Sequence, residues 1–116
     1  MLKKIKIAIP TRGDKGLEDV VSEVFGRAET FTIIEVSDDS IDRVEVVKNQ
    51  AVSYDYGAGP IAVKMLVDMG VTAVAAGELG IGASTLLEQN NIEKVKVEAD
   101  IPAKKALEIV MTSLSS

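Results

Sequence analysis

Cysteine, histidine and tryptophan are all absent from the 116 residues. Without cysteine the chain has no disulfide, no thiolate nucleophile and no thiolate ligand for zinc or an iron–sulfur cluster. Without histidine it also lacks the commonest general base and the commonest metal ligand. Any catalysis would have to come from carboxylates, lysines, hydroxyls or backbone groups. We therefore expect a binding protein and not an enzyme.

Basic residues are outnumbered by acidic ones, 13 to 18, and long apolar runs are lacking. The formal net charge is −5, so the broad basic surface that binds nucleic acid is not expected. No apolar run approaches the ~18 residues of a membrane-spanning helix, and Lys6 and Pro10 interrupt the first apolar stretch before it could serve as a signal core. A length of 116 residues predicts a single domain, 1–116, large enough for a proper core, and the 47% apolar content excludes a disordered chain. Since no targeting segment is visible, a cytoplasmic protein is expected.

Hydrophobic patterning predicts an α/β protein with the element order βββαβαβα. β-Branched and alternating runs predict five strands, and helical spacing predicts three later helices, with about two turns of helix at Leu17–Val24 before the second strand. Val71–Ala76 is apolar throughout, which is typical of a parallel strand covered on both faces. The strands are expected at 5–9, 30–36, 41–47, 71–76 and 95–97, and the later helices at 60–69, 83–90 and 102–114.

The connections place several loops at one edge of this sheet. A loop and a hairpin make the first three strands run up, down and up, and right-handed crossovers make the later strands parallel to the first. Ligands of open α/β sheets bind outside the carboxyl ends of the strands. We therefore expect a ligand site where five segments converge: 11–14, 25–28, 54–60, 77–83 and 100–102.

Glycine-rich turns precede two of the predicted helices at that edge. Their small residues let backbone approach a ligand, and the first amides of a helix favour an anion. Turn geometry alone is the alternative explanation. The run 57–62 also matches the dinucleotide pattern GxGxxA, with Glu78 at a plausible distance, but a loop of about ten residues separates it from the preceding strand and argues against that function. The glycines concerned are Gly57, Gly59, Gly77, Gly80 and Gly82.

Two arginines belong to the converging loops. Arg12 and Arg27 could each present a guanidinium to an anion, and Arg27 could instead, or also, pair with Glu78 or Asp14. Phe25 is expected to pack beneath its loop.

Four acidic residues also fall in these loops. Their carboxylates could gather around Mg²⁺, but we expect caps and solvated turn residues in preference to a metal site. They are Asp14, Asp55, Glu78 and Asp100.

Three motifs follow one another in a recognisable order: Phe25-Gly26-Arg27-Ala28, Gly57-Ala58-Gly59-Pro60 and the run 74–80, VAAGELG, with Ala83 after it. With these motifs the chain, from Ile5 to about Val110, resembles a stand-alone member of the dinitrogenase iron-molybdenum cofactor biosynthesis family, the domain shared by NifX, NafY and the C-terminal part of NifB.

The resemblance implies a ribonuclease-H-like fold, with a mixed five-stranded sheet and helices on both faces. It also implies a nitrogen-fixation-related role in carrying an iron–sulfur or iron–molybdenum cluster precursor, with a protein partner in cluster assembly. Family members often place histidine where this chain has Val24, and some carry histidine or cysteine where Tyr54–Tyr56 stands here. Direct ligation of a cluster is therefore not expected. A nuclease activity is also excluded, because the first strand offers no acidic residue for a metal.

The leading hypothesis is a non-enzymatic carrier or accessory protein that holds an anionic ligand or cluster at the carboxyl-end edge. The alternatives are a nucleotide or phosphometabolite binder using the same edge, and an interaction module without a small ligand. The expected ligand-binding residues are Arg12, Phe25, Gly26, Arg27, Gly57, Ala58, Gly59, Gly77, Glu78, Gly80 and Gly82.

Overall fold

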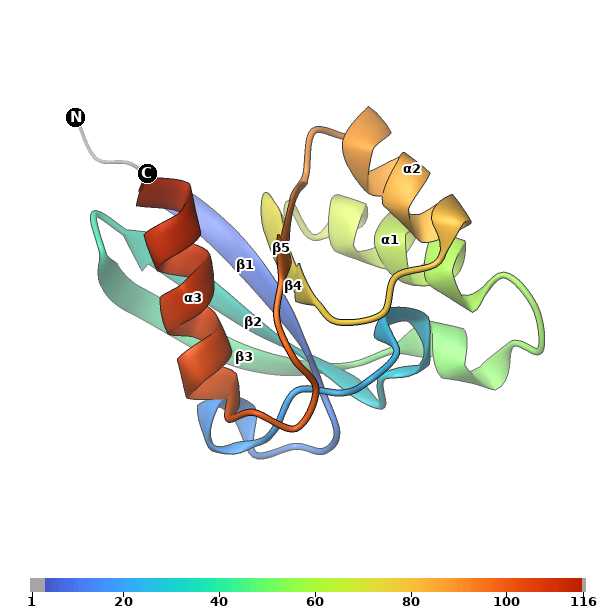
Figure 1. Ribbon diagram of the computed structural model, residues 1–116, viewed down its shortest axis with the longest axis horizontal. Coiled ribbons are helices and arrows are strands. Elements are labelled where there is room, and N and C mark those ends of the chain that lie inside the picture. The colour runs from blue at the N-terminus through green and yellow to red at the C-terminus, as the bar shows by residue number, and fades with distance from the viewer. Residues whose placement is uncertain (1–3, 116) are drawn as a thin grey trace.

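Five strands form one mixed sheet in the computed structural model, which describes residues 4–115 (Figure 1). The strand order is β3-β2-β1-β4-β5, with antiparallel pairing among the first three strands and parallel pairing of β4 with β1 and β5. The predicted mixed sheet and strand directions are thus confirmed, while the ribonuclease-H-like label stays a prediction. The strands are β1 (Lys4–Thr11), β2 (Thr30–Ser37), β3 (Ser40–Lys48), β4 (Ala73–Ala76) and β5 (Glu93–Lys96).

Helices cover both faces of the sheet, as predicted (Figure 1). Successive residues of a strand point to opposite faces, so Ala8 packs with α1 and α2 while its neighbours Ile7 and Ile9 pack with α3. Each face therefore has its own apolar cluster, and the strands are shared between them. The helices are α1 (Ala58–Asp68), α2 (Ile81–Gln89) and α3 (Ala103–Ser115).

The prediction of a helix at Leu17–Val24 is wrong. The apolar spacing is helical, but only the short 3-10 helix η1 (Gly16–Glu18) forms there. The rest of the segment is extended, because isolated β-bridges join Val20 to Pro102, Val21 to Thr11 and Val24 to Glu78. This extended segment lies across the carboxyl-end edge of the sheet and helps to build it.

Two more 3-10 helices occupy connections predicted as loops. η2 (Phe25–Arg27) leads into β2, and η3 (Gln50–Ser53) lies within the loop predicted at 48–56. Both contact α1 and each other. They therefore form a layer around the N-terminus of α1, on the edge where β1, β3, β4 and β5 end.

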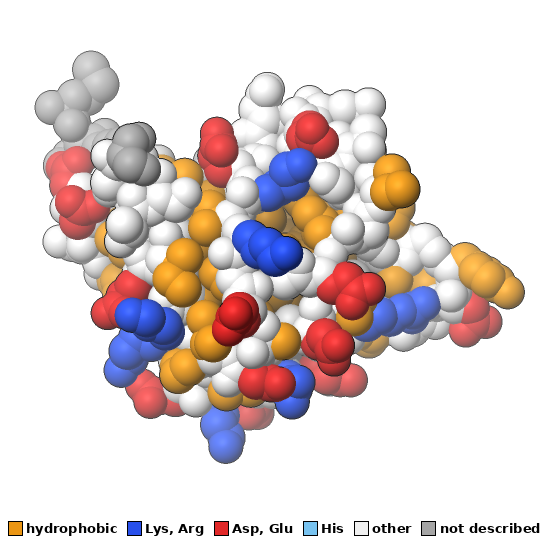
Figure 2. Space-filling model, viewed as in Figure 1, with side chains coloured by type: hydrophobic (Ala, Val, Ile, Leu, Met, Phe, Trp, Pro, Cys, Tyr) orange, Lys and Arg blue, Asp and Glu red, His pale blue; other side chains and the backbone are white. Residues whose placement is uncertain are grey.

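The surface in the view of Figure 2 carries acidic and basic side chains interspersed with hydrophobic ones. No broad basic region appears on this face, in keeping with the net charge of −5. Among the helices within residues 4–115, none combines the length and the apolar character that crossing a bilayer requires.

Candidate functional site

An open cavity of about 290 Å³ lies at the carboxyl-end edge of the sheet. Residues from three segments far apart in sequence line it: Val24–Arg27 around η2, Gly57–Pro60 at the start of α1, and Gly80 with Gly82 and Ala83 at the start of α2. The chain thus brings both glycine-rich turns and Arg27 to one place. Eight of the expected ligand-binding residues line this cavity: Phe25, Gly26, Arg27, Gly57, Ala58, Gly59, Gly80 and Gly82.

Three glycines let these segments approach one another closely. A Cβ on Gly26 would lie 2.7 Å from the Gly59 nitrogen, and a Cβ on Gly59 would lie 3.0 Å from the Ala83 Cβ. A Cβ on Gly82 would lie 3.3 Å from the ring of Pro60. Close packing therefore explains why these three positions are glycine. The cavity is built where the backbones of the three segments fit closely together.

The helix starts supply unpaired amides on one side of the cavity. Gly57 is left-handed, with φ 72°, and turns the chain into α1, whose first amides belong to Ala58 and Gly59. Gly80 precedes α2 in an extended conformation. The first amides of a helix have no intrahelical acceptor, and they carry the positive end of the helix dipole. Two such ends bordering one cavity favour a negatively charged occupant.

Arg27 is exposed and uses its guanidinium on backbone carbonyls. Nη1 donates to the Tyr54 carbonyl at 2.7 Å, and Nη2 donates to the Asp55 carbonyl at 2.9 Å. The predicted ion pair with Glu78 or Asp14 is therefore wrong: Arg27 takes part in no salt bridge within residues 4–115. The reason is local, because η2 places Arg27 beside the segment that leads into α1.

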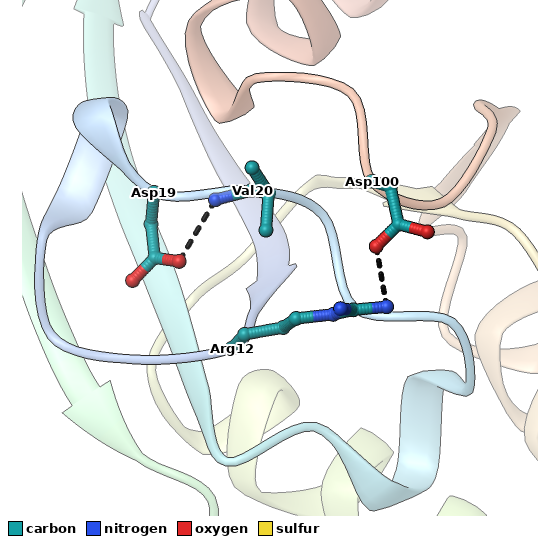
Figure 3. Close-up of polar contacts among 4 residues, drawn as sticks. All are labelled: Arg12, Asp19, Val20 and Asp100. Carbon is teal, nitrogen blue, oxygen red and sulfur yellow. Dashed lines mark hydrogen bonds and ion pairs between the residues drawn. The ribbon is translucent and has the colours of Figure 1, made fainter.

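Arg12 lies outside the cavity. Its amide donates to the Val20 carbonyl at 3.3 Å. Its guanidinium forms an ion pair with Asp100 (Figure 3). Asp19 nearby accepts hydrogen bonds from its neighbours' amides, among them that of Val20. These contacts fasten the 10–20 segment to the loop before α3, so Arg12 has a structural partner at a different part of the edge.

Glu78 and Gly77 also fall outside the cavity lining. The Glu78 amide donates to the Glu23 carbonyl and its carbonyl accepts from the Phe25 amide, both at 3.2 Å. Gly77 lies where a Cβ would be 3.3 Å from the Val97 carbonyl oxygen. Glu78 therefore pairs with the backbone of the 23–25 segment, and Gly77 lies in a closely packed backbone. Phe25 is buried as expected, with its ring 5.1 Å from that of Phe31.

Asn49 is a site residue that the sequence reasoning missed. It is buried, and its side-chain nitrogen donates to the carbonyls of Gly26 at 3.1 Å and Ala28 at 2.9 Å. Its side-chain oxygen accepts from the Ala51 amide at 3.0 Å, which caps η3. Asn49 therefore holds η2 and η3 together. An asparagine directly after a strand and before a turn is the signal that could have found it.

The carboxylates and the GxGxxA run considered as metal and dinucleotide sites can be placed within residues 4–115. Within residues 4–115 no group of three acidic side chains is placed to hold a metal ion, so Asp14, Asp55, Glu78 and Asp100 do not form the Mg²⁺ alternative. The GxGxxA pattern begins after η3 and a further turn, and not at the end of a strand. The dinucleotide fingerprint needs a strand leading directly into its first glycine.

Comparison with known proteins identifies relatives over nearly the whole chain. Residues 3–113 match the family model described as dinitrogenase iron-molybdenum cofactor. An uncharacterised protein of Methanocaldococcus jannaschii is 30% identical over 95 residues, which are 82% of this chain and 76% of that protein.

Solved structures share the architecture. The apo orange protein of Desulfovibrio gigas superposes with a TM-score of 0.83 at 25% identity, covering 93% of this chain and 88% of that one. A Thermotoga protein with a provisional NifB assignment superposes with a TM-score of 0.74 at 31% identity, over the same shares of the two chains. The chain belongs to the dinitrogenase iron-molybdenum cofactor family.

Proposed function

We propose that this chain is a non-enzymatic carrier or accessory protein that holds an anionic ligand in the cavity at the starts of α1 and α2. Family membership points to an iron–sulfur or iron–molybdenum cluster precursor as the cargo. The observation that carries the proposal is the meeting of two glycine-started helix N-termini and Arg27 around one open cavity.

The donor set decides how such a cargo would be held. The sequence contains no cysteine or histidine, and the cavity lining contains no carboxylate. Soft metal centres are normally ligated by thiolate or imidazole, so a covalent bond from protein to cluster does not fit these residues. Backbone amides and a guanidinium do fit the outer atoms of an anion through charge-assisted hydrogen bonds. The proposed mode is therefore non-covalent.

Gly80 offers a direct test of this mode. It stands at the N-cap of α2 with φ −66°, and a Cβ there would meet nothing within 4 Å. An aspartate is a preferred N-cap residue, so Gly80→Asp would place a carboxylate on the amides at the cavity without straining the fold. This internal anion would compete with an external one. We expect Gly80→Asp to lower anion affinity at least ~10-fold while leaving the melting temperature equal to or above that of the wild type.

The measurement begins with native mass spectrometry on protein purified without oxygen, which identifies any bound cargo. Titration of the apo protein with molybdate, inorganic phosphate and AMP, followed by amide chemical shifts, then compares the wild type with Gly80→Asp and its uncharged control Gly80→Ala. Shifts confined to residues 57–61 and 80–84 that disappear only in Gly80→Asp support the proposal. AMP binding tighter than that of the inorganic anions would favour the nucleotide alternative. Equal anion binding by the wild type and Gly80→Asp would refute the site.

A further inference from the structure

A short exposed strap borders the cavity. We call Tyr54–Gly57 the strap; it connects η3 to α1, and Gly57 at its end lines the cavity. Figure 1 shows this connection as the outermost loop beside α1. The side chains of Tyr54 and Tyr56 are 52% and 90% exposed, so they contribute little burial that would hold the strap in place.

Arg27 is the main anchor of the strap. Its guanidinium binds the carbonyls of Tyr54 and Asp55, as described above. Within residues 4–115, the remaining backbone hydrogen bonds of the strap are at its two ends: the Tyr54 amide donates to Ala51, and the Gly57 carbonyl accepts from Ile61. The middle of the strap therefore depends on one side chain that comes from a different part of the sequence.

Arg27 is also one of the residues that line the cavity. A guanidinium carries more N–H donors than these two carbonyl bonds use, so Arg27 can bind the strap and an anion together. The hydrogen bonds to the two carbonyls restrict the rotamers of a long exposed side chain before any anion binds. The entropic cost of ordering that side chain on anion binding is therefore smaller. An anion beside the guanidinium would in turn hold that side chain against the strap.

We propose that Arg27 is a positioning residue that couples the strap to the cavity, so that an anion in the cavity orders the strap and the strap orients the guanidinium toward the anion. The coupling rests on the proposed function, because it needs an anion in the cavity. Linkage requires the effect to be reciprocal: the factor by which a bound anion favours the ordered strap is also the factor by which the ordered strap raises anion affinity.

The sequence supplies a reporter for this coupling. The two tyrosines of the chain both lie in the strap, and tryptophan is absent. Tyrosine emission anisotropy therefore reports on the strap alone, without a label. Backbone ¹⁵N order parameters of residues 54–57 give a second, residue-resolved measure of its motion on the picosecond to nanosecond scale. With molybdate or inorganic phosphate as the probe, both quantities should rise in the wild-type protein as the probe saturates.

Arg27→Lys separates positioning from charge. Lysine keeps the positive charge but has no planar fork with which to bind two carbonyls. In the free protein we expect the order parameters of residues 54–57 to fall to those of an unanchored loop, with no change in the rest of the chain. Probe affinity should fall about 10-fold, the effect of losing one hydrogen bond to a charged group. Arg12→Lys is the matched control, since Arg12 pairs with Asp100 outside the cavity, and it should change neither quantity.

Three outcomes would overturn the coupling. If the strap of free Arg27→Lys is as ordered as that of the wild type, Arg27 does not position it, whatever the anion does. If a probe binds the wild type and Gly80→Asp abolishes that binding, yet anisotropy and order parameters do not change, the cavity works without the strap and the proposed function survives alone. If no probe binds, the proposed function fails and the coupling fails with it, while the free-protein comparison still measures the anchoring by Arg27.

Discussion

Gly26 is the residue where the backbones of two site segments come closest. An added Cβ would lie 2.7 Å from the nitrogen and 2.9 Å from the Cα of Gly59, and both are backbone atoms of α1 that cannot rotate away. We expect Gly26→Ala to force η2 away from α1 and to lower the free energy of unfolding by about 1–3 kcal/mol, the usual cost of overpacking. Urea denaturation followed by far-UV circular dichroism measures this change.

Gly80→Ala is the matched control for Gly26→Ala. Gly80 lines the same cavity, but its φ of −66° suits any residue and its Cβ direction is empty. Because alanine is a poorer N-cap than glycine, the substitution of Gly80 should lower the free energy of unfolding by about 0.5–1 kcal/mol, less than Gly26→Ala does. Equal stability of the two variants would show that the close approach at Gly26 is relaxed in solution.

At the scale of single residues, the sequence predicts which residues form the site better than it predicts the hydrogen-bond partners of those residues. The burial of Phe25 and the glycine turns follow from residue type and spacing. The partners of Arg27 do not, because they are the carbonyls of Tyr54 and Asp55, and every residue has a carbonyl. The ion pair expected for Arg27 was the choice that side-chain chemistry favours, and the fold places a different acceptor within reach.

Among the elements, η2 and η3 are joined through one buried side chain. Asn49 donates to two carbonyls of the η2 region and caps η3. Asn49→Ala would leave the carbonyls of Gly26 and Ala28 without these donors, and an unsatisfied buried polar group costs about 1–3 kcal/mol. We expect a loss of about 2–3 kcal/mol in the free energy of unfolding, measured by urea denaturation.

Asn90→Ala is the control for that substitution. Asn90 also donates to a carbonyl, that of Leu86, but it is exposed at the end of α2, where water can replace it. The change there should stay within about 0.5 kcal/mol. A loss of the same size in both variants would mean that Asn49 acts no differently from a surface asparagine, and that η2 and η3 are held by other contacts.

Whether an element could be predicted from local sequence pattern depends on whether its hydrogen-bond partners are local or distant in sequence. The three α-helices and five strands are present close to their predicted positions, because their periodicity and turn residues agree with the fold. Leu17–Val24 has helical spacing as well, yet its amides and carbonyls pair with partners distant in sequence: the Val21 amide donates to Ile101, and the Ser22 amide to Pro10. Such pairing leaves no local trace, so hydrophobic spacing gave the wrong element there.

For the molecule as a whole, the sheet is the part that both hydrophobic clusters share. Strand directions could be predicted because each crossover forces a parallel return, and the converging edge follows from those directions. The closeness of fit at the cavity could not be predicted, because it depends on contacts such as that between Gly59 and Ala83, which join residues from two helices.

Two buried valines on opposite faces test whether the shared sheet makes the molecule one cooperative unit. Val63 of α1 belongs to the cluster beneath α1 and α2, and Val110 of α3 belongs to the cluster beneath α3; each is no more than 1% exposed. Each valine-to-alanine substitution removes buried methyl groups and should cost about 2 kcal/mol. Because the two residues lie in different clusters, the free energy of unfolding of the double variant should fall by the sum of the two losses, about 4 kcal/mol, to within ~0.5 kcal/mol.

Urea denaturation of the wild type, the two single variants and the double variant should show a single transition with an unchanged m-value, since neither cluster can lose its packing without exposing strands that the other needs. Two transitions in either single variant, or a lowered m-value, would show that the two faces unfold separately and that the edge carrying the cavity depends on only one of them.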